Sequence, residues 1–369
     1  MASFSATKID SFFKGKPTIS KLECDGVAGG IVGDDTVVSA CEEQGSLSYT
    51  VSCTTKTIVS FRRRGTAIDS RVVKLSKDIH GRLVPSAFYC GTVGQGEDTL
   101  MIYKMTYLPG QSWAKLRPSR PYLNGYEQLK LATMYRDMGR YFARAYMNPL
   151  SKSSGWEAKS LMETSDYEDD RAQIQKRLTI LEECGKYPYL AGFFQEAEAS
   201  LPKLFADSYP KVLTHGDLSW RNFLLDEKTY RISGIIDWSL ASIRPFGMDL
   251  KALLLLQFFD VDDNGVTFYQ GHENLREIFW DEFWKVTGIE EEKQKDVRRL
   301  AELAGKLKYI IDLAFQRDNG KIIDVLGPFN DDCIEGYFGD AKKEADTVQA
   351  DRNSLEDSVQ HMPVGVGDS

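Results

Sequence analysis

The chain has 369 residues, of which 42% are hydrophobic and 27% charged, and its formal net charge is −8. This composition is typical of a globular protein with a sizeable core, and the length predicts either two or three domains or one two-lobed fold. An acidic chain has no electrostatic attraction for nucleic-acid phosphates or anionic lipids. We therefore expect neither a nucleic acid nor a membrane as a partner, and the sequence carries no signal for an oligomeric state.

Targeting signals and paired cysteines are lacking in the sequence. No apolar run approaches the ~20 residues of a membrane-spanning helix, and residues 1–16 lack the basic start and apolar block of a secretory signal. The six cysteines are scattered without paired spacing, which favours neither a disulfide framework nor a zinc site. We expect reduced thiols and a cytoplasmic protein.

The first 110 residues are predicted to be rich in β-strand. Alternating polar and apolar residues predict one hairpin from 47–55 and 57–62, with Lys56 at the turn, and a second from 87–93 and 99–107. Between the hairpins, apolar residues at helical spacing predict a helix over 67–79, which Gly81 ends.

After Trp113 the pattern becomes mainly helical. A long amphipathic helix is predicted over 126–146, where Asn148 and Pro149 follow as breakers. The remaining predicted elements are helices near 171–184 and 191–205, strands at 212–213, 223–225 and 232–236, and then helices to about residue 340. This order predicts an α+β, bilobal fold with a small β-rich N-terminal lobe and a larger, mainly helical C-terminal lobe.

One segment, residues 213–226, carries a pattern with clear chemistry. It holds His215, Asp217 and Asn222 in the order H-x-D-x-x-x-x-N, and Asp237 follows at the end of an apolar strand. This order matches the phosphoryl-transfer template of protein kinases. The chemistry needs a carboxylate beside the acceptor hydroxyl and hard oxygen ligands for Mg²⁺, which an amide and a carboxylate at neighbouring strand ends can supply.

With these motifs the chain resembles the aminoglycoside phosphotransferase and choline-kinase-like family, a small-molecule branch of the protein-kinase-like fold, and its fungal members most of all. The resemblance rests on residues 215–222, 236–238 and 245–250. It implies the following roles: Asp217 as catalytic base, His215 bracing the catalytic loop, Asn222 and Asp237 holding Mg²⁺, and Asp249 supporting the loop.

A plainer interpretation stays open for part of this motif. Asp and Asn side chains often cap local backbone, which would explain Asp217 and Asn222 without catalysis. For His215, a purely structural hydrogen-bonded role is as well supported as a functional one.

The resemblance also implies a nucleotide site in the small lobe. The loop at residues 44–49 would cover the phosphates of ATP through Gly45, Ser46 and Ser48, although an ordinary polar turn fits this sequence almost as well. The segment near Met105 would hold adenine through its backbone. The implied division is an N-terminal extension at 1–40, the nucleotide lobe at 41–110, the catalytic and substrate lobe at 111–340 and a disordered acidic tail at 341–369.

The basic residue that grips the phosphates departs from the family pattern. Kinases of this fold supply a Lys or Arg from the third strand and a Glu from the next helix. By register the basic position falls on Ser60, and Arg62 lies on the same strand face and could substitute. Arg71 stands where the Glu is expected, and Asp69 is the nearby acid that could replace it.

Three functions follow from these observations. The leading one is a Mg²⁺-dependent phosphotransferase that moves the γ-phosphoryl of ATP to a hydroxyl of a small metabolite. The second is an enzyme of the same fold repurposed for a non-phosphoryl reaction in specialised metabolism. The third is a catalytically silent, pseudokinase-like binding protein, for which Arg71 is the clue. The net charge favours a cationic acceptor, such as an amine or aminosugar.

Overall fold

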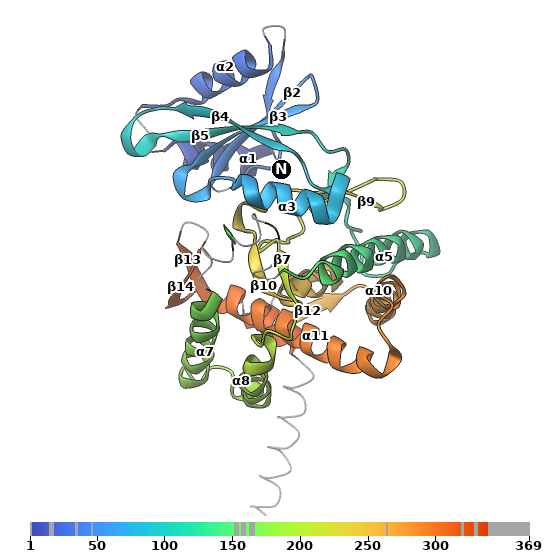
Figure 1. Cartoon of the computed structure of the whole chain (residues 1–369). Helices are drawn as coiled ribbons and strands as arrows, with labels where there is room; N and C mark the ends of the chain where they lie inside the picture. The colour runs from blue at the N-terminus through green and yellow to red at the C-terminus, as the bar shows by residue number, and fades with distance from the viewer. Residues whose placement is uncertain are drawn as a thin grey trace, which may run out of the picture.

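The small lobe is built on a five-stranded antiparallel sheet, at the top of Figure 1, which shows a computed structural model of the chain. The structure describes residues 2–14, 18–33, 36–45, 47–150, 155, 160–161, 167–262, 265–318, 321–327 and 331–338. The predicted tail at 341–369 lies outside these residues. Across the sheet, the strands are β1 (Val38–Ala40), β2 (Ser48–Cys53), β3 (Thr57–Arg63), β5 (Leu100–Thr106) and β4 (Ala87–Val93).

Both hairpins predicted for the small lobe are confirmed. The first pairs Ser48 with Arg62, and Lys56 at its turn has a φ of 54°, the left-handed conformation that a tight turn requires. The second pairs β4 with β5. β1 also pairs with β2, so the sheet begins before residue 41, where the sequence analysis starts this lobe.

Two N-terminal helices cover one face of this sheet. They are α1 (Ala2–Phe13) and α2 (Lys21–Val32), and Phe12 and Ala28 pack into one apolar cluster with Tyr49 and Phe61 of the strands. The opposite face carries two buried polar residues, Ser60 and Arg62, because alternate residues of a strand point to opposite faces.

Helix α3 (Ser70–His80) lies between the sheet and the larger lobe (Figure 1). The predicted helix is confirmed, but it begins three residues late because residues 64–66 form a 3-10 turn and the Asp69 side chain caps the helix. Val72 and Ile79 belong to the apolar core of the larger lobe, so α3 is packed on that lobe as well as on the sheet.

The larger lobe is mainly helical, as predicted. Its helices are α4 (Trp113–Leu116), α5 (Gly125–Met147), α7 (Tyr167–Glu183), α8 (Ala191–Leu204), α9 (Lys251–Gln257), α10 (His272–Thr287), α11 (Glu291–Ala314) and α12 (Asp331–Tyr337). The core lies where α5 packs on α10, with Phe142 against Phe279 at a centroid distance of 5.8 Å. None of the helices within the described residues is long and apolar enough to cross a membrane.

Short strands interrupt these helices and position the loop that carries His215, Asp217 and Asn222. They are β6 (Gln111–Ser112) with β8 (Phe223–Leu225) and β9 (Ile232–Ile235), β7 (Lys211–Thr214) with β10 (Ser242–Pro245), β11 (Phe258–Asp262) with β12 (Gly265–Phe268), and β13 (Phe315–Asp318) with β14 (Lys321–Leu326). The expectation that helices follow residue 236 up to about residue 340 is therefore only partly right, because β10 to β14 lie in this range. An Asn-Gly dipeptide, a strong hairpin signal, stands in the sequence at 264–265 and at 319–320.

Candidate active site

The side chain of Asp249, in the 3-10 turn η6 (Met248–Leu250), holds the loop between β7 and β8 in place. The backbone N–H groups of His215 and Gly216 both donate to the Asp249 carboxylate, which is buried. Gly216 has a φ of 78°, and a Cβ there would lie 2.2 Å from the Leu240 carbonyl oxygen. The loop therefore approaches the neighbouring turn η5 (Trp238–Leu240) as closely as only glycine permits.

The ring of His215 joins this loop to the segment that carries Asp237. The side chain is completely buried, and Nδ1 accepts a hydrogen bond from the backbone N–H of Asp217 at 3.4 Å. In the neutral ring the proton is then on Nε2, which lies 2.8 Å from the Ile236 carbonyl oxygen and donates to it. The ring also packs on Trp238 at a centroid distance of 4.8 Å.

Asp217 and Asn222 lie together within the loop. The amide nitrogen of Asn222 donates to the backbone carbonyl of Asp217 at 2.7 Å and approaches its carboxylate at 3.4 Å. This is the local backbone bond expected of a capping residue. The backbone carbonyl of Asn222 accepts from the N–H of Ile236 at 3.0 Å, and that bond brings Asn222 beside the residue next to Asp237.

Asp237 occupies a strained position and is paired with Arg62. Its φ of 64° is in the left-handed region, where such strain in a non-glycine residue is typical of functional sites. One carboxylate oxygen, Oδ1, accepts from Arg62 Nη2 at 2.9 Å and from the Ser239 hydroxyl at 2.9 Å. Burial disfavours the ionised form, but Arg62 and Ser239 outweigh it, so the pKa of Asp237 lies below its usual value.

The structure does not show the expected ion pair between a basic residue of the third strand and an acid of the next helix, which in the family pattern binds the nucleotide phosphates. Arg71, at the position of the family's Glu, pairs with Asp69 and also donates to Ser160 at 2.6 Å. Asp69 is therefore taken by Arg71, and the idea that it could hold Arg62 is wrong. Arg62 instead donates Nε to the Thr66 carbonyl at 2.8 Å and turns its other end to Asp237.

The predicted phosphate loop is described only in part. Ser46 lies outside the described residues, and Ser48 is a buried residue of β2 that pairs with Arg62. Gly45 is next to Gln44, whose buried side chain bonds to the backbone of Cys41 and Thr50 and fixes the start of the loop.

The segment expected to hold adenine, near Met105, lies entirely within the described residues. Met105 lies within β5, where it pairs with Ile58 and Ala87. The backbone N–H of Tyr107, just beyond the strand, donates to the Lys56 carbonyl at 3.3 Å.

Two residues that lie beside the site, His80 and Lys251, were not predicted from the sequence. His80, the last residue of α3, is buried and stacks on Tyr141 with a centroid distance of 4.2 Å. Burial, and then the nearby Arg144 and His215, lower its pKa to about 3. Lys251 begins α9, directly under the catalytic loop, with a side chain that is only 6% exposed. A lysine inside the otherwise apolar run 250–256 was the available signal.

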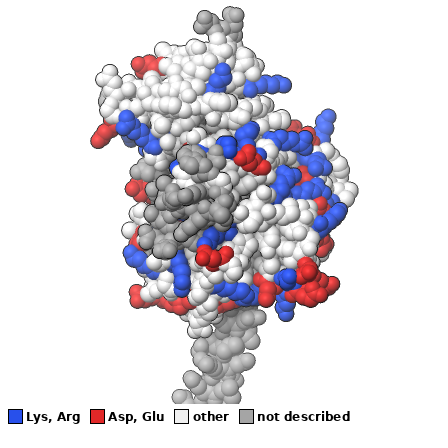
Figure 2. Space-filling model, viewed as in Figure 1, with Lys and Arg blue, Asp and Glu red and all other residues white. Residues whose placement is uncertain are grey.

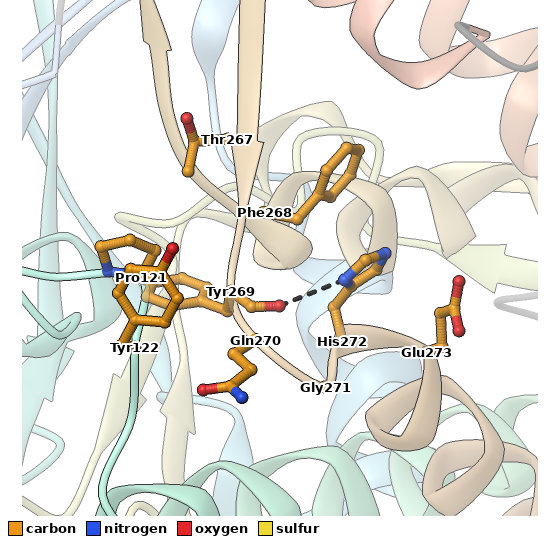
Figure 3. A pocket seen from close by; sticks show the side chains of 9 residues that line it. All are labelled: Pro121, Tyr122, Thr267, Phe268, Tyr269, Gln270, Gly271, His272 and Glu273. Atoms are coloured by element: carbon orange, nitrogen blue, oxygen red, sulfur yellow. Dashed lines mark hydrogen bonds between the residues drawn. The ribbon is translucent and has the colours of Figure 1, made fainter.

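Among the described residues, neither the charge on the face in Figure 2 nor the pocket in Figure 3 marks a second group of site residues of the same kind. On the face shown in Figure 2, charged side chains of both signs are concentrated on the larger lobe. A pocket of about 420 Å³ is lined by residues 121–122 and 267–273 (Figure 3). It contains none of the site residues predicted from the sequence, and its His272 bonds to the Tyr269 carbonyl at 3.1 Å.

Comparison with models of known protein families assigns the chain to one of them. The sequence model of the phosphotransferase enzyme family matches residues 66–281, which include the catalytic loop and Asp237 but begin after Arg62. No curated protein matches the chain.

Several solved structures resemble this fold at low identity. The GDP complex of aminoglycoside 2'-phosphotransferase-IIIa has 16% identity and a TM-score of 0.45, covering 83% of this chain and 88% of that chain. The ADP-bound aminoglycoside phosphotransferase APH(2'')-Ib has 15% identity and a TM-score of 0.45, with 81% and 93% covered. A putative aminoglycoside phosphotransferase from Ralstonia eutropha has 16% identity and a TM-score of 0.48, with 84% and 93% covered. Because the family model spans more than half of the sequence, the chain belongs to the phosphotransferase enzyme family.

Proposed function

We propose that this protein transfers the γ-phosphoryl group of ATP to a hydroxyl group of a small metabolite, with Mg²⁺. Asp217 accepts the hydrogen bond of the acceptor hydroxyl and orients it. Asn222 and Asp237 hold the metal. His215 and Asp249 act as positioning residues, because both are buried and contact the loop rather than its open side.

The observation that carries the proposal is the way in which the loop brings these groups together. Asn222 contacts Asp217 directly and bonds to the backbone beside Asp237. Its amide nitrogen faces the backbone carbonyl and the carboxylate of Asp217, so its amide oxygen faces away from these groups. This oxygen and Asp237 Oδ2 would supply two hard oxygen donors, the ligand type that Mg²⁺ prefers. When bound, Mg²⁺ neutralises charge on the transferring phosphoryl group.

The contact between Arg62 and Asp237 supports one alternative, a catalytically silent binding protein. Arg62 already neutralises part of the charge that the metal would use, and no acid of α3 holds Arg62 in place for a nucleotide. Against this alternative, the set of Asp217, Asn222 and Asp237 is complete, and Asn222 is in contact with Asp217.

The test is calorimetric titration of the chain with ATP, with and without Mg²⁺, for the wild type and Asp237→Ala. We expect Mg²⁺-dependent binding in the wild type and its loss in the variant. Asp281→Ala, at an exposed position of α10, is the matched control and should bind as the wild type does. Circular dichroism of both variants checks the fold.

Measuring turnover distinguishes the phosphotransferase from the catalytically silent binding protein. A candidate acceptor that gains the mass of one phosphate group, with Mg²⁺ and Asp217 required, supports phosphoryl transfer. Mg²⁺-dependent ATP binding without ATP consumption across a panel of hydroxyl compounds supports the binding protein. Unchanged ATP binding in Asp237→Ala would refute the assignment of this residue to the metal.

A further inference from the structure

Two acidic residues just before the predicted phosphate loop contact the larger lobe. Glu43 Oε1 accepts a hydrogen bond from the Ser112 hydroxyl at 2.9 Å. Glu42, the residue before it, accepts a hydrogen bond from Lys115 Nζ. Because Ser112 belongs to β6 and Lys115 to α4, both contacts cross from the small lobe to the larger lobe. We call these four residues the lobe bridge.

The bond from Ser112 is the stronger of the two contacts. Ser112 is only 3% exposed, so water has little access to its hydroxyl, whereas the side chain of Glu42 is 82% exposed and an exposed ion pair contributes little. Ser112 also occupies the N-cap position of α4, where a serine side chain usually accepts a bond from the helix backbone. It makes no such bond here, and its hydroxyl bonds to Glu43 instead.

The segment that carries both donors is also joined to the catalytic loop. β6 pairs with β8, the strand that follows this loop. The backbone N–H of Ala114 donates to the Trp220 carbonyl at 3.1 Å, and Trp220 lies between Asp217 and Asn222 in the sequence. Residues 112–115 therefore contact the start of the phosphate loop with their side chains and the catalytic loop with their backbone.

The start of the phosphate loop is held firmly within the small lobe as well. The side chain of Gln44 bonds to the backbone of Cys41 and Thr50. Its backbone carbonyl accepts a hydrogen bond from Lys8 Nζ of α1 at 3.0 Å. Because these bonds hold the segment as one piece, a contact at Glu43 fixes the position of the start of the loop and not only of one side chain.

We propose that Ser112 and Lys115 are positioning residues. Through Glu43 and Glu42 they hold the phosphate loop in register with the catalytic loop, so that the phosphates of ATP are aligned with the acceptor. In the family pattern an acid of the helix after the third strand holds the phosphate-binding cation. Arg71 stands in place of that acid, and the lobe bridge aligns the two lobes by a different contact. The inference rests on the proposed function.

The first measurement needs no nucleotide. Hydrogen exchange of the segment that contains Glu43 is followed by mass spectrometry in the wild type and in Ser112→Ala. We expect exchange to be roughly tenfold faster in the variant, the size expected when one hydrogen bond to a charged group is lost. Lys21→Gln is the control, because Lys21 also donates to an acid, Asp25, but both residues lie within α2. Its exchange in this segment should match that of the wild type.

The second measurement is a double-mutant cycle on ATP affinity, by calorimetric titration with Mg²⁺. Ser112→Ala and Glu43→Ala should each weaken ATP binding roughly tenfold. The double variant should bind no more weakly than either single variant, because both substitutions remove the same bond. Glu43→Gln keeps an oxygen acceptor for the Ser112 hydroxyl and should restore most of the affinity. Lys115→Gln should weaken binding by roughly threefold or less, because its ion pair is exposed.

The outcomes separate this inference from the proposed function. If Ser112→Ala binds ATP as the wild type does, or if the two single effects add in the double variant, the inference is overturned and the proposed function stands. Tighter ATP binding in Ser112→Ala also overturns it, because the contact would then hinder the nucleotide. Unchanged hydrogen exchange in Ser112→Ala overturns the inference alone. If the wild type binds no ATP with Mg²⁺, the proposed function fails and the inference fails with it.

Discussion

The buried carboxylate of Asp249 accepts backbone hydrogen bonds from His215 and Gly216. The variant Asp249→Asn tests how much these two bonds contribute to the stability of the folded chain. Asn keeps the shape but places a nitrogen where one oxygen accepted, so one backbone N–H loses its acceptor. A buried unsatisfied donor costs about 1–3 kcal/mol, and the other bond, no longer charge-assisted, loses about 1 kcal/mol more. We expect the free energy of unfolding to fall by about 2–4 kcal/mol, a large share of the about 5–15 kcal/mol typical of a domain.

The assay is urea denaturation of the wild type and the variant, followed by tryptophan fluorescence. Asp226→Asn is the matched control, because Asp226 also accepts backbone bonds from two residues, Lys228 and Thr229, but is exposed on a hairpin turn. Both of these bonds end on the same oxygen, Oδ1, which Asn keeps, and the turn is exposed to water, so this variant should unfold close to the wild type. Equal, small losses in the two variants would refute the reasoning that burial makes the Asp249 contacts expensive to break.

Three further predictions concern the same elements. Asp312→Asn should lower the free energy of unfolding by about 3–5 kcal/mol, because it leaves buried ammonium groups without their carboxylate; an unchanged urea midpoint would contradict the ion pairing. Because the pKa of Asp312 is lowered in the folded chain, its contribution is present above its unfolded pKa of about 4 and is lost as the pH falls through the folded value. The melting temperature of the wild type should therefore fall more steeply below pH 4 than that of Asp312→Asn. Gly216→Ala should abolish turnover and lower the melting temperature because its Cβ meets a carbonyl oxygen, whereas Gly192→Ala in α8, where nothing lies within 4 Å, should leave both unchanged or raise stability slightly.

The fold was predictable from the sequence wherever one local pattern dominated a segment. The long helix α5 and the two small-lobe hairpins were found because each shows a clear hydrophobic period. The hairpins β11–β12 and β13–β14 were missed because their strands are short and adjoin strongly helical segments. Their Asn-Gly dipeptides were the only local sign, and a turn signal alone does not show which residues pair.

Only part of the candidate site could be predicted from the sequence, for the same reason. His215, Asp217 and Asn222 could be predicted as site residues because they lie at a short, characteristic spacing in the sequence. The contact between Arg62 and Asp237 joins residues 175 positions apart, and no spacing rule reaches that far. The contacts of Asp312 with Lys251, Lys308 and Arg317 likewise join three elements, α9, α11 and β13, whose packing only the tertiary structure defines.

Arg62 connects the two halves of the proposed site, because it extends from the sheet face expected to bind the nucleotide to Asp237, the carboxylate proposed to bind the metal. In the family pattern an acid on the helix after the third strand would hold this cation for the phosphates. Here Arg71 occupies that position and takes Asp69 for itself, so Asp237 takes over the role of partner. The pair keeps Asp237 ionised through its Oδ1 and leaves Oδ2 outside the contact. A nucleotide bound with Mg²⁺ would have to draw the guanidinium group away from Asp237, whose carboxylate is already oriented, so turnover and not this contact decides between an enzyme and a silent binding protein.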